Sequence, residues 1–249
     1  MKYALVQGQR REAQPGLSGE CPACRSVMTP KCGQLKVWHW AHRSIRSCDP
    51  WWENETPWHR AWKNQFPADW QEKVHRADNG EKHVADVRTK SGVVLEFQHS
   101  PLPLRERAAR EAFYRNMVWV VHASSRDKAK LSQGIVMRVG QPPIYVLRSD
   151  ECALLRAWGG SGVPVYFDFG DGDPNLWRLT PDRRNGMAYL LPVGKASFVA
   201  EYLVGEAVER TCAGYTTTTL NSLRRTLRPQ PPSAFERHLA RKERARPRF

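Results

Sequence analysis

Four of the six cysteines lie in the first fifth of the chain, at spacings typical of metal ligands. Cys21 and Cys24 form a C-x2-C pair, which can hold a tetrahedral zinc ion with two thiolates. Zinc needs two more ligands, and the segment downstream offers four side chains for them: Cys32, His39, His42 and Cys48. We expect a structural zinc held by Cys21, Cys24, His42 and Cys48, with His39 or Cys32 as alternatives that spacing alone does not separate.

The alternative is that these cysteines are reduced and packed as small apolar side chains. Their polar flanks, ECPACR and RSCD, do not resemble core sequence. The first residues contain too short an apolar stretch for a signal peptide, so we expect a cytoplasmic, reducing location and no disulfide framework. Cys152 and Cys212 stand alone and read as buried small side chains.

Two carboxylates lie inside apolar strands that a tight turn connects. Asp86 lies in VADV and Glu96 in VLEF, and a turn near Gly92 would centre the strand pairing on residue 91. The two acids would then face each other on one side of a sheet. Close carboxylates repel unless a cation lies between them, and oxygen ligands suit Mg²⁺ or Mn²⁺. In the competing interpretation, Asp86 and Glu96 pair with Arg or Lys at the sheet surface.

Further polar side chains can form a wall over this acidic pair. Glu55, His59 and Lys63 fall at i, i+4 and i+8 of a predicted helix, which places them on one face. Gln98 follows Glu96 by two residues and therefore shares its face of the strand. A stripe of this kind is also common on a solvated helix surface.

The elements that must position these residues follow from the hydrophobic pattern. We predict a short strand at 3–7, a loop from 9 to 20, and a hairpin formed by 26–30 and 34–42. A helix at 55–65 precedes strands at 72–77, 83–89 and 93–98, a helix at 104–116 and an apolar strand at 118–123. This order of helix, three strands, helix and strand predicts an α/β layered core.

The second half carries weaker signals. Strands are predicted at 144–149, 163–170, 176–181 and 188–193, with helices at 151–158 and 197–211. Residues 224–249 hold nine Lys or Arg against two Glu, and they read as a basic tail or a phosphate-contacting arm. We therefore divide the chain into a zinc-binding region (1–52), a core (53–130), a mixed α+β region (131–222) and a basic tail (223–249).

Composition limits the partners. The formal net charge is +14, and a protein this basic usually binds a polyanion, with nucleic acid the leading class. The alternative is that the protein is basic without binding a polyanion. No apolar run reaches the length of a membrane-spanning helix, so no membrane partner is expected. No feature of the sequence indicates a particular oligomeric state.

The order of these motifs resembles a known family. C-x2-C, HWAH, E-T-x-x-H-x-x-x-K, ADV, LEFQHS and R-x-x-x-Y follow one another between about residues 20 and 123. This arrangement resembles the competence protein CoiA-like family, which is assigned to the PD-(D/E)xK nuclease superfamily. The resemblance implies a restriction-endonuclease-like core behind a small zinc ribbon, and a nuclease that uses Mg²⁺ or Mn²⁺.

The resemblance also implies roles for particular residues. Asp86 and Glu96 would bind the catalytic metal, Glu55 would bind metal or water, and Lys63, beside His59, would orient a phosphate. Gln98 stands where many relatives place a lysine, whose positive charge glutamine does not supply. On the next helix, Arg110 and Tyr114 would face the sheet or the DNA. In the tail we expect DNA contacts from Arg241, Lys242 and Arg244.

Three functions remain open at this point. The leading hypothesis is a metal-dependent DNA nuclease of recombination, competence or defence. A second is a non-catalytic DNA-binding recombination protein, with Gln98 as the sign of lost chemistry. The third is an HNH-type nuclease with His39 or His42 as base near Asn54 and His59, and it leaves Asp86 and Glu96 unexplained.

Overall fold

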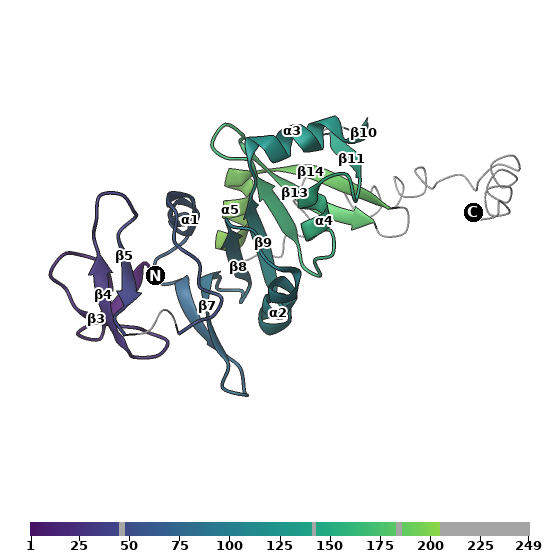
Figure 1. The fold of residues 1–249 in the computed structure, drawn as a ribbon. Coiled ribbons are helices and arrows are strands. Elements are labelled where there is room, and N and C mark those ends of the chain that lie inside the picture. The colour runs from purple at the N-terminus through teal and green to yellow at the C-terminus, as the bar shows by residue number, and fades with distance from the viewer. Residues whose placement is uncertain (45–47, 141–142, 183–185, 205–249) are drawn as a thin grey trace, which may run out of the picture.

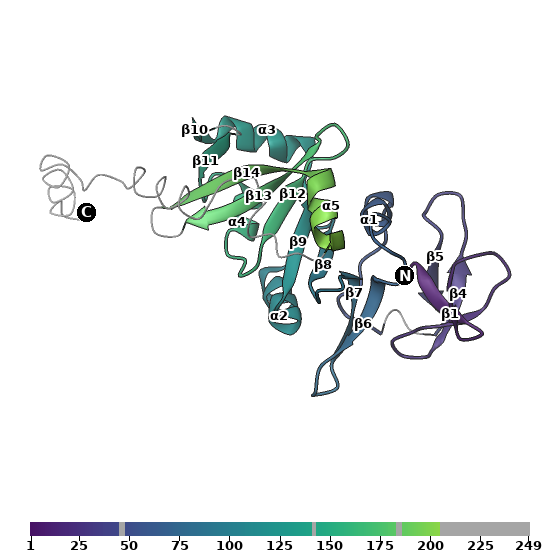
Figure 2. The same ribbon diagram turned by 180° about the vertical axis from the view of Figure 1, so that it is seen from behind.

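The computed structural model describes residues 1–44, 48–140, 143–182 and 186–204, and these form two sheets of unequal size. The small sheet, built from the first 42 residues, lies beside helix α1 (Pro57–Lys63) and strand β7 (Lys82–Arg88) (Figure 1). The large sheet and its helices form the rest of the described molecule (Figure 2). The predicted tail contacts Arg241, Lys242 and Arg244, together with Cys212, lie outside the described residues.

The small sheet is antiparallel with five strands in the order β2-β1-β3-β4-β5. Its strands are β1 (Tyr3–Val6), β2 (Gln9–Glu12), β3 (Gly19–Glu20), β4 (Val27–Lys31) and β5 (His39–His42). The predicted hairpin is confirmed, with Met28 opposite His42. The prediction of a loop from 9 to 20 was wrong for β2 and β3. The sequence QRRE of β2 lacks alternating apolar residues because this mostly exposed edge strand is held by its backbone pairing with β1.

The large sheet is mixed and has nine strands in the order β10-β11-β14-β13-β12-β9-β8-β7-β6. Strands β6 (Gln71–Arg76), β7 and β8 (Val94–Gln98) form an antiparallel meander. Helix α2 (Leu104–Tyr114) then leads to β9 (Met117–His122), which pairs with β8 in parallel. The predicted order of helix, three strands, helix and strand is therefore present.

The second half of the chain continues the same sheet. It contributes β10 (Ile135–Val139), β11 (Ile144–Arg148), β12 (Val165–Asp168), β13 (Asn175–Asp182) and β14 (Met187–Gly194). Helices α3 (Ser125–Gln133), α4 (Ala153–Trp158) and α5 (Lys195–Val204) lie between or after these strands. Neither α3 nor β10 was predicted from the sequence, and both are largely exposed. Strand β12 pairs with β9 in parallel, so strands from the predicted 53–130 and 131–222 segments hydrogen-bond directly.

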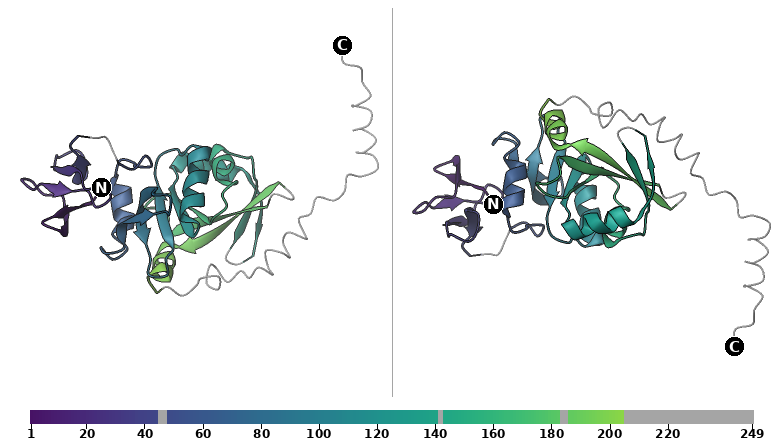
Figure 3. Two further views of the ribbon diagram at one scale, coloured as in Figure 1. Left: turned by 90° about the horizontal axis from the view of Figure 1, so that it is seen from below. Right: turned by 90° about the horizontal axis from the view of Figure 1, so that it is seen from above.

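Apolar side chains cover both faces of the large sheet. On one face, Trp62 of α1 and Phe198 of α5 pack with Phe97, Val120 and other strand residues. On the other face, Leu131 of α3 and Leu155 of α4 pack with Trp119 and Phe167. The views from below and above show helices on both sides of the sheet (Figure 3). No helix in the described ranges is both long and apolar enough to cross a membrane.

Helix α1 is shorter than predicted because a cap fixes its start. The Thr56 side chain accepts a hydrogen bond from the backbone N–H of His59, and the His59 ring reaches back to the backbone N–H of Thr56. Glu55 therefore precedes the helix, and the expectation that it shares a helical stripe with His59 and Lys63 was wrong. Two indole N–H groups, of Trp58 and Trp62, each donate to the Asp168 carboxylate of β12 at 2.8 Å and fasten α1 to the sheet.

Candidate functional site

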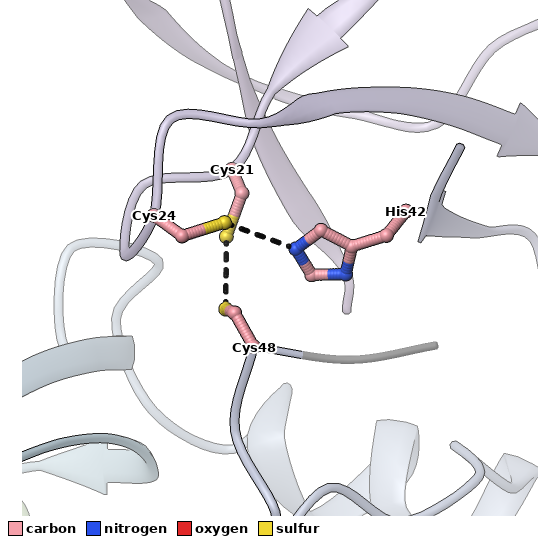
Figure 4. A group of neighbouring side chains, drawn as sticks. All are labelled: Cys21, Cys24, His42 and Cys48. Carbon is pink, nitrogen blue, oxygen red and sulfur yellow. Dashed lines mark hydrogen bonds between the residues drawn. The ribbon is translucent and has the colours of Figure 1, made fainter. Parts of the chain in front are cut away.

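Three thiols and one imidazole converge at the edge of the small sheet. The ligand atoms of Cys21, Cys24, His42 and Cys48 all lie within 4.8 Å of one another (Figure 4). The Sγ atoms of Cys21 and Cys48 are 3.7 Å apart, and Cys24 Sγ lies 3.3 Å from His42 Nε2. Zn–S bonds of about 2.3 Å in a tetrahedron place two sulfurs about 3.8 Å apart. The cluster is therefore consistent with a structural zinc.

The local backbone explains why the first two ligands meet. The N–H of Arg25 donates to Cys21 O at 2.9 Å, and Cys21 N–H donates to Ser26 O at 2.9 Å. Arg25 has a φ of 66°, so the chain turns tightly under both thiols. Burial alone would raise the pKa of Cys24, but hydrogen bonds from Ser26 lower it to about 6, which favours the thiolate.

The two alternative ligands lie outside this cluster. The His39 ring contacts Val37 O through Nδ1 at 2.8 Å, and Cys32 packs at the edge of the small apolar core. Of the ligand sets that spacing left open, the structure thus brings together the one with His42 and Cys48.

Asp86 and Glu96 meet where the pairing of β7 and β8 ends. The register is Val87 opposite Leu95 and Arg88 opposite Val94, which confirms the predicted axis at residue 91. At the next residue pair beyond this register, hydrogen bonds to side chains replace those between the two backbones. The N–H of Asp86 donates to Glu96 Oε1 at 3.2 Å, and the N–H of Phe97 donates to Asp86 Oδ2 at 3.0 Å. The two carboxyl groups therefore bridge the diverging strands.

The surroundings disfavour a charge on both acids. Burial, reinforced by Asp86, raises the pKa of Glu96 to about 8, although Arg110 opposes this shift. Burial also raises the pKa of Asp86, against the effects of Lys63 and His59. Arg110 Nη1 lies 3.4 Å from Glu96 Oε2. The two carboxyl groups thus hold their protons more tightly than ordinary acids do, and a cation placed between them would favour their charged forms.

These acids line a cavity of about 140 Å³ between the two sheets. The small sheet supplies His39, Trp40 and His42, and the segment after it supplies Cys48, Asp49, Trp51, Trp52, Glu53 and Glu55. Polar groups of the large sheet and its helices complete the wall: His59, Lys63, Glu72, Asp86, Glu96, Arg110 and Tyr114. The structure therefore brings most of the predicted site residues to one place.

Lys63 is a buried cation of this cavity, as is Arg110. Its Nζ lies 2.8 Å from Glu55 Oε1 and 2.9 Å from Glu72 Oε1, and its pKa is raised because these acids outweigh the effect of burial. Burial alone would raise the pKa of Glu55, but Lys63 and Arg60 lower it to about 2. Lys63 and Glu55 are thus both charged at neutral pH.

Gln98 lies apart from the other predicted groups. It does not belong to the described residues that line the cavity. Its side-chain amide donates to Glu53 Oε2 at 3.2 Å and to Ser100 O at 2.9 Å. Glu53 also accepts the Ser100 N–H at 2.8 Å and lies 3.3 Å from His59 Nε2. Gln98 therefore holds Glu53, which does face the cavity.

Two residues of the following helix turn inward. Arg110 is buried, and besides Glu96 it contacts Glu106 and donates to Trp51 O at 2.8 Å. The Tyr114 ring packs edge-on against Trp51. Of the two orientations expected for Arg110 and Tyr114, the structure therefore has the one toward the sheet.

Sequence reasoning missed three carboxylates of the cavity: Asp49, Glu53 and Glu72. Glu72 has a φ of 47°, and it accepts the backbone N–H groups of Lys2 and Tyr3 as well as Lys63. These partners lie far away in sequence, which leaves no local pattern. For Glu53, the run of acids and tryptophans in WWENE was the available signal.

Within the described ranges, the cysteine cluster is the one group of three or more His, Cys, Asp or Glu side chains close enough to share a metal ion. Among the described His, Cys, Asp and Glu side chains, Asp86 and Glu96 meet as a pair without a third at that distance. Water, backbone or substrate oxygens can complete the coordination of an ion between them.

Comparison with known proteins bears on the cysteine cluster. No curated protein and no solved structure matches the chain significantly. Residues 18–50 match the family model of the competence protein CoiA, N-terminal domain. The matched segment contains all four cluster ligands, from Cys21 to Cys48. By this comparison, the zinc-type cluster and the hairpin that carries it are similar to the CoiA N-terminal domain.

Proposed function

We propose that this protein is a metal-dependent DNA nuclease with a PD-(D/E)xK-type core. The observation that carries the proposal is the meeting of Asp86 and Glu96 where two strands diverge, in a cavity that also holds Lys63 and Arg110. The net charge of +14 supports DNA as the partner. The similarity of residues 18–50 to the CoiA N-terminal domain supports a role in competence or recombination.

The donor set fits a hard divalent cation. Asp86 and Glu96 supply carboxylate oxygens, which Mg²⁺ and Mn²⁺ prefer, and Asp86 is only partly buried at the cavity wall. When bound, such an ion polarises a phosphoryl oxygen and lowers the pKa of its bound water.

The other residues have roles that follow from their contacts. Arg110 fixes the orientation of Glu96 through the 3.4 Å contact and is itself held by Trp51 O. Lys63 places a positive charge in the cavity, where it can stabilise the negative charge of a phosphate. In this role it replaces the lysine that Gln98 does not provide. Gln98 acts indirectly by holding Glu53.

A second candidate is a DNA-binding protein without catalysis. It is favoured by the contacts that Asp86 and Glu96 already make with backbone N–H groups and Arg110, and by the absence of a third acid close to them among the described side chains. The HNH-type alternative ranks last, because His42 belongs to the cysteine cluster and Asn54 is exposed.

Cleavage of labelled DNA in Mg²⁺ or Mn²⁺ tests the proposal, with single-stranded, duplex, tailed and branched substrates. Asp86→Asn and Glu96→Gln keep the shape of each side chain and should lower the cleavage rate by at least about 100-fold. Asp69→Asn and Glu20→Gln, at exposed positions, are the matched controls and should cleave like the parent.

Two outcomes separate the candidates. Equal cleavage by the parent and both site variants contradicts the nuclease proposal. If no substrate is cut while DNA binding is salt-sensitive and survives both substitutions, the non-catalytic candidate replaces it.

A further inference from the structure

Two tryptophans are exposed beside the acidic cavity. Trp52 lines the cavity and is 43% exposed, and Trp38, which is 46% exposed, directly precedes the lining residue His39. Most large aromatic side chains of the described molecule are buried or half-buried, so this exposure is a feature to explain. We call Trp38 and Trp52 the indole pair.

Hydrogen bonds hold Trp38 in place. Its indole N–H donates to Gly33 O at 3.2 Å, across the β4–β5 connection. Its carbonyl accepts Arg60 Nη2 at 2.9 Å, and Arg60 belongs to α1, the helix that carries His59 and Lys63. The backbone of Trp38 is therefore tied to the helix that forms one wall of the cavity, and its ring is held against the β4–β5 connection.

The hairpin segment that carries Trp38 is rich in exposed cations. The β4–β5 hairpin carries Lys31 and Lys36 as exposed side chains, and Arg43 follows it, also exposed. Aromatic rings interspersed with cations suit an unpaired nucleic acid strand, because the rings stack on bases while the cations bind phosphates. A duplex offers no free base faces to such rings.

The cavity itself selects against a duplex. Glu96 is only 5% exposed and Lys63 only 3%, so a phosphodiester must enter the cavity to reach them. A space of about 140 Å³ can take a phosphodiester group. An unpaired strand can bend to bring one phosphate into such a space more easily than a duplex, whose persistence length is about 150 base pairs.

We infer that the substrate of this site is unpaired DNA, with Trp38 and Trp52 stacking on bases of the strand whose phosphate enters the cavity. This inference rests on the proposed nuclease function for the cleavage step, but the binding step does not depend on it. A free single strand and the unpaired tail of a duplex share this chemistry.

Binding without divalent ions tests the inference separately from cleavage. Fluorescence anisotropy compares a labelled single strand, the blunt duplex of the same sequence and a duplex with an unpaired tail, on the full chain in buffer without added Mg²⁺ or Mn²⁺ and without chelator, with the zinc content verified before and after the measurement. We expect the single strand and the tailed duplex to bind more tightly than the blunt duplex. Trp38→Ala and Trp52→Ala should each weaken single-strand binding by about 5- to 150-fold, the effect of removing one base–aromatic stack.

Matched variants guard against a general loss of folding. Trp38→Phe and Trp52→Phe keep a ring and should retain most of the affinity, while Val136→Ala removes an exposed apolar side chain on distant β10 and should change nothing. The inference is overturned if the blunt duplex binds as tightly as the single strand, or if both alanine variants bind the single strand like the parent. Unchanged cleavage by Asp86→Asn and Glu96→Gln would instead contradict the nuclease proposal and leave the binding result standing.

Discussion

The cysteine cluster and the acidic pair are both candidate metal centres. They differ in whether their ligand atoms already have other hydrogen-bond partners. At the cluster, three thiols and an imidazole converge at distances close to the edges of a zinc tetrahedron. At the acidic pair, Asp86 and Glu96 already accept backbone N–H groups, and Arg110 contacts Glu96. The thiol and imidazole ligands of the cluster thus nearly complete a metal site by themselves. The two acids, in contrast, depend on neighbouring residues for their orientation and charge.

A substitution in the cysteine cluster should have the largest effect on metal content and stability. Cys21→Ser should lose zinc and unfold the small sheet, because structural zinc contributes about 10–16 kcal/mol of binding free energy in zinc-finger peptides. Elemental analysis and urea denaturation measure both results. Cys32→Ser, which lies outside the cluster, is the control and should keep one zinc per chain. Zinc retained by Cys21→Ser, or absent from the parent, would contradict the assignment.

Loss of the buried cation Lys63 should strongly lower the free energy of unfolding. Lys63→Met leaves Glu55 and Glu72 buried without their shared partner, and breaking a buried ion pair costs about 3–5 kcal/mol. Urea denaturation gives the free energy of unfolding. Lys73→Met, on the same meander but exposed, should change it by less than about 0.5 kcal/mol. Equal stability of the two variants would show that Lys63 does not hold the cavity together.

The next largest effect on stability is expected from acidification, because it protonates Glu55. Its pKa is about 2 in the folded state against an ordinary value near 4.5, so its stabilising contribution is present above about pH 4.5 and is lost as pH falls toward 2. The loss is on the order of 1–3 kcal/mol. Glu55→Gln should be less stable than the parent at neutral pH, and the difference should shrink on acidification. A difference independent of pH, measured by urea denaturation, would refute this account.

The smallest effect is expected at Gln98. Gln98→Met removes one donor to Glu53 and should cost about 1 kcal/mol of unfolding free energy. Because Gln98 does not face the cavity, cleavage should fall far less than in Glu96→Gln. Gln98→Lys can still donate to Glu53 and should restore stability. A loss of cleavage equal to that of Glu96→Gln would place Gln98 in the reaction itself.

Local spacing explains which parts the sequence could predict. The cluster and the axis at residue 91 depend on short separations, and both were found as expected. The zinc ligands His42 and Cys48 could not be chosen over His39 and Cys32 until the hairpin register was known. Strand β2 was missed because a polar edge strand carries no alternating pattern.

The cavity depended on contacts that local patterns do not encode. Glu72 binds the backbone of Lys2 and Tyr3 about 70 positions away in sequence, and Glu53 meets Ser100 across a separation of 47. Gln98 was predicted beside the reacting groups because it shares a strand face with Glu96. The alternation of side chains along a strand predicts the face on which Gln98 lies. It does not predict its hydrogen-bond partner, which is Glu53.

The bonds from Trp58 and Trp62 to Asp168 have a consequence for the timing of synthesis. They span 110 and 106 residues, so β12 must leave the ribosome before α1 can be fastened to the sheet. At about 5–20 residues per second, this delay is roughly 5 to 20 s. During that interval the small sheet and its cysteine cluster are already synthesised, while His59 and Lys63 still lack their anchored helix. The nascent chain therefore completes its cysteine cluster first, and fastens α1 only after Asp168 of its 249 residues has been made.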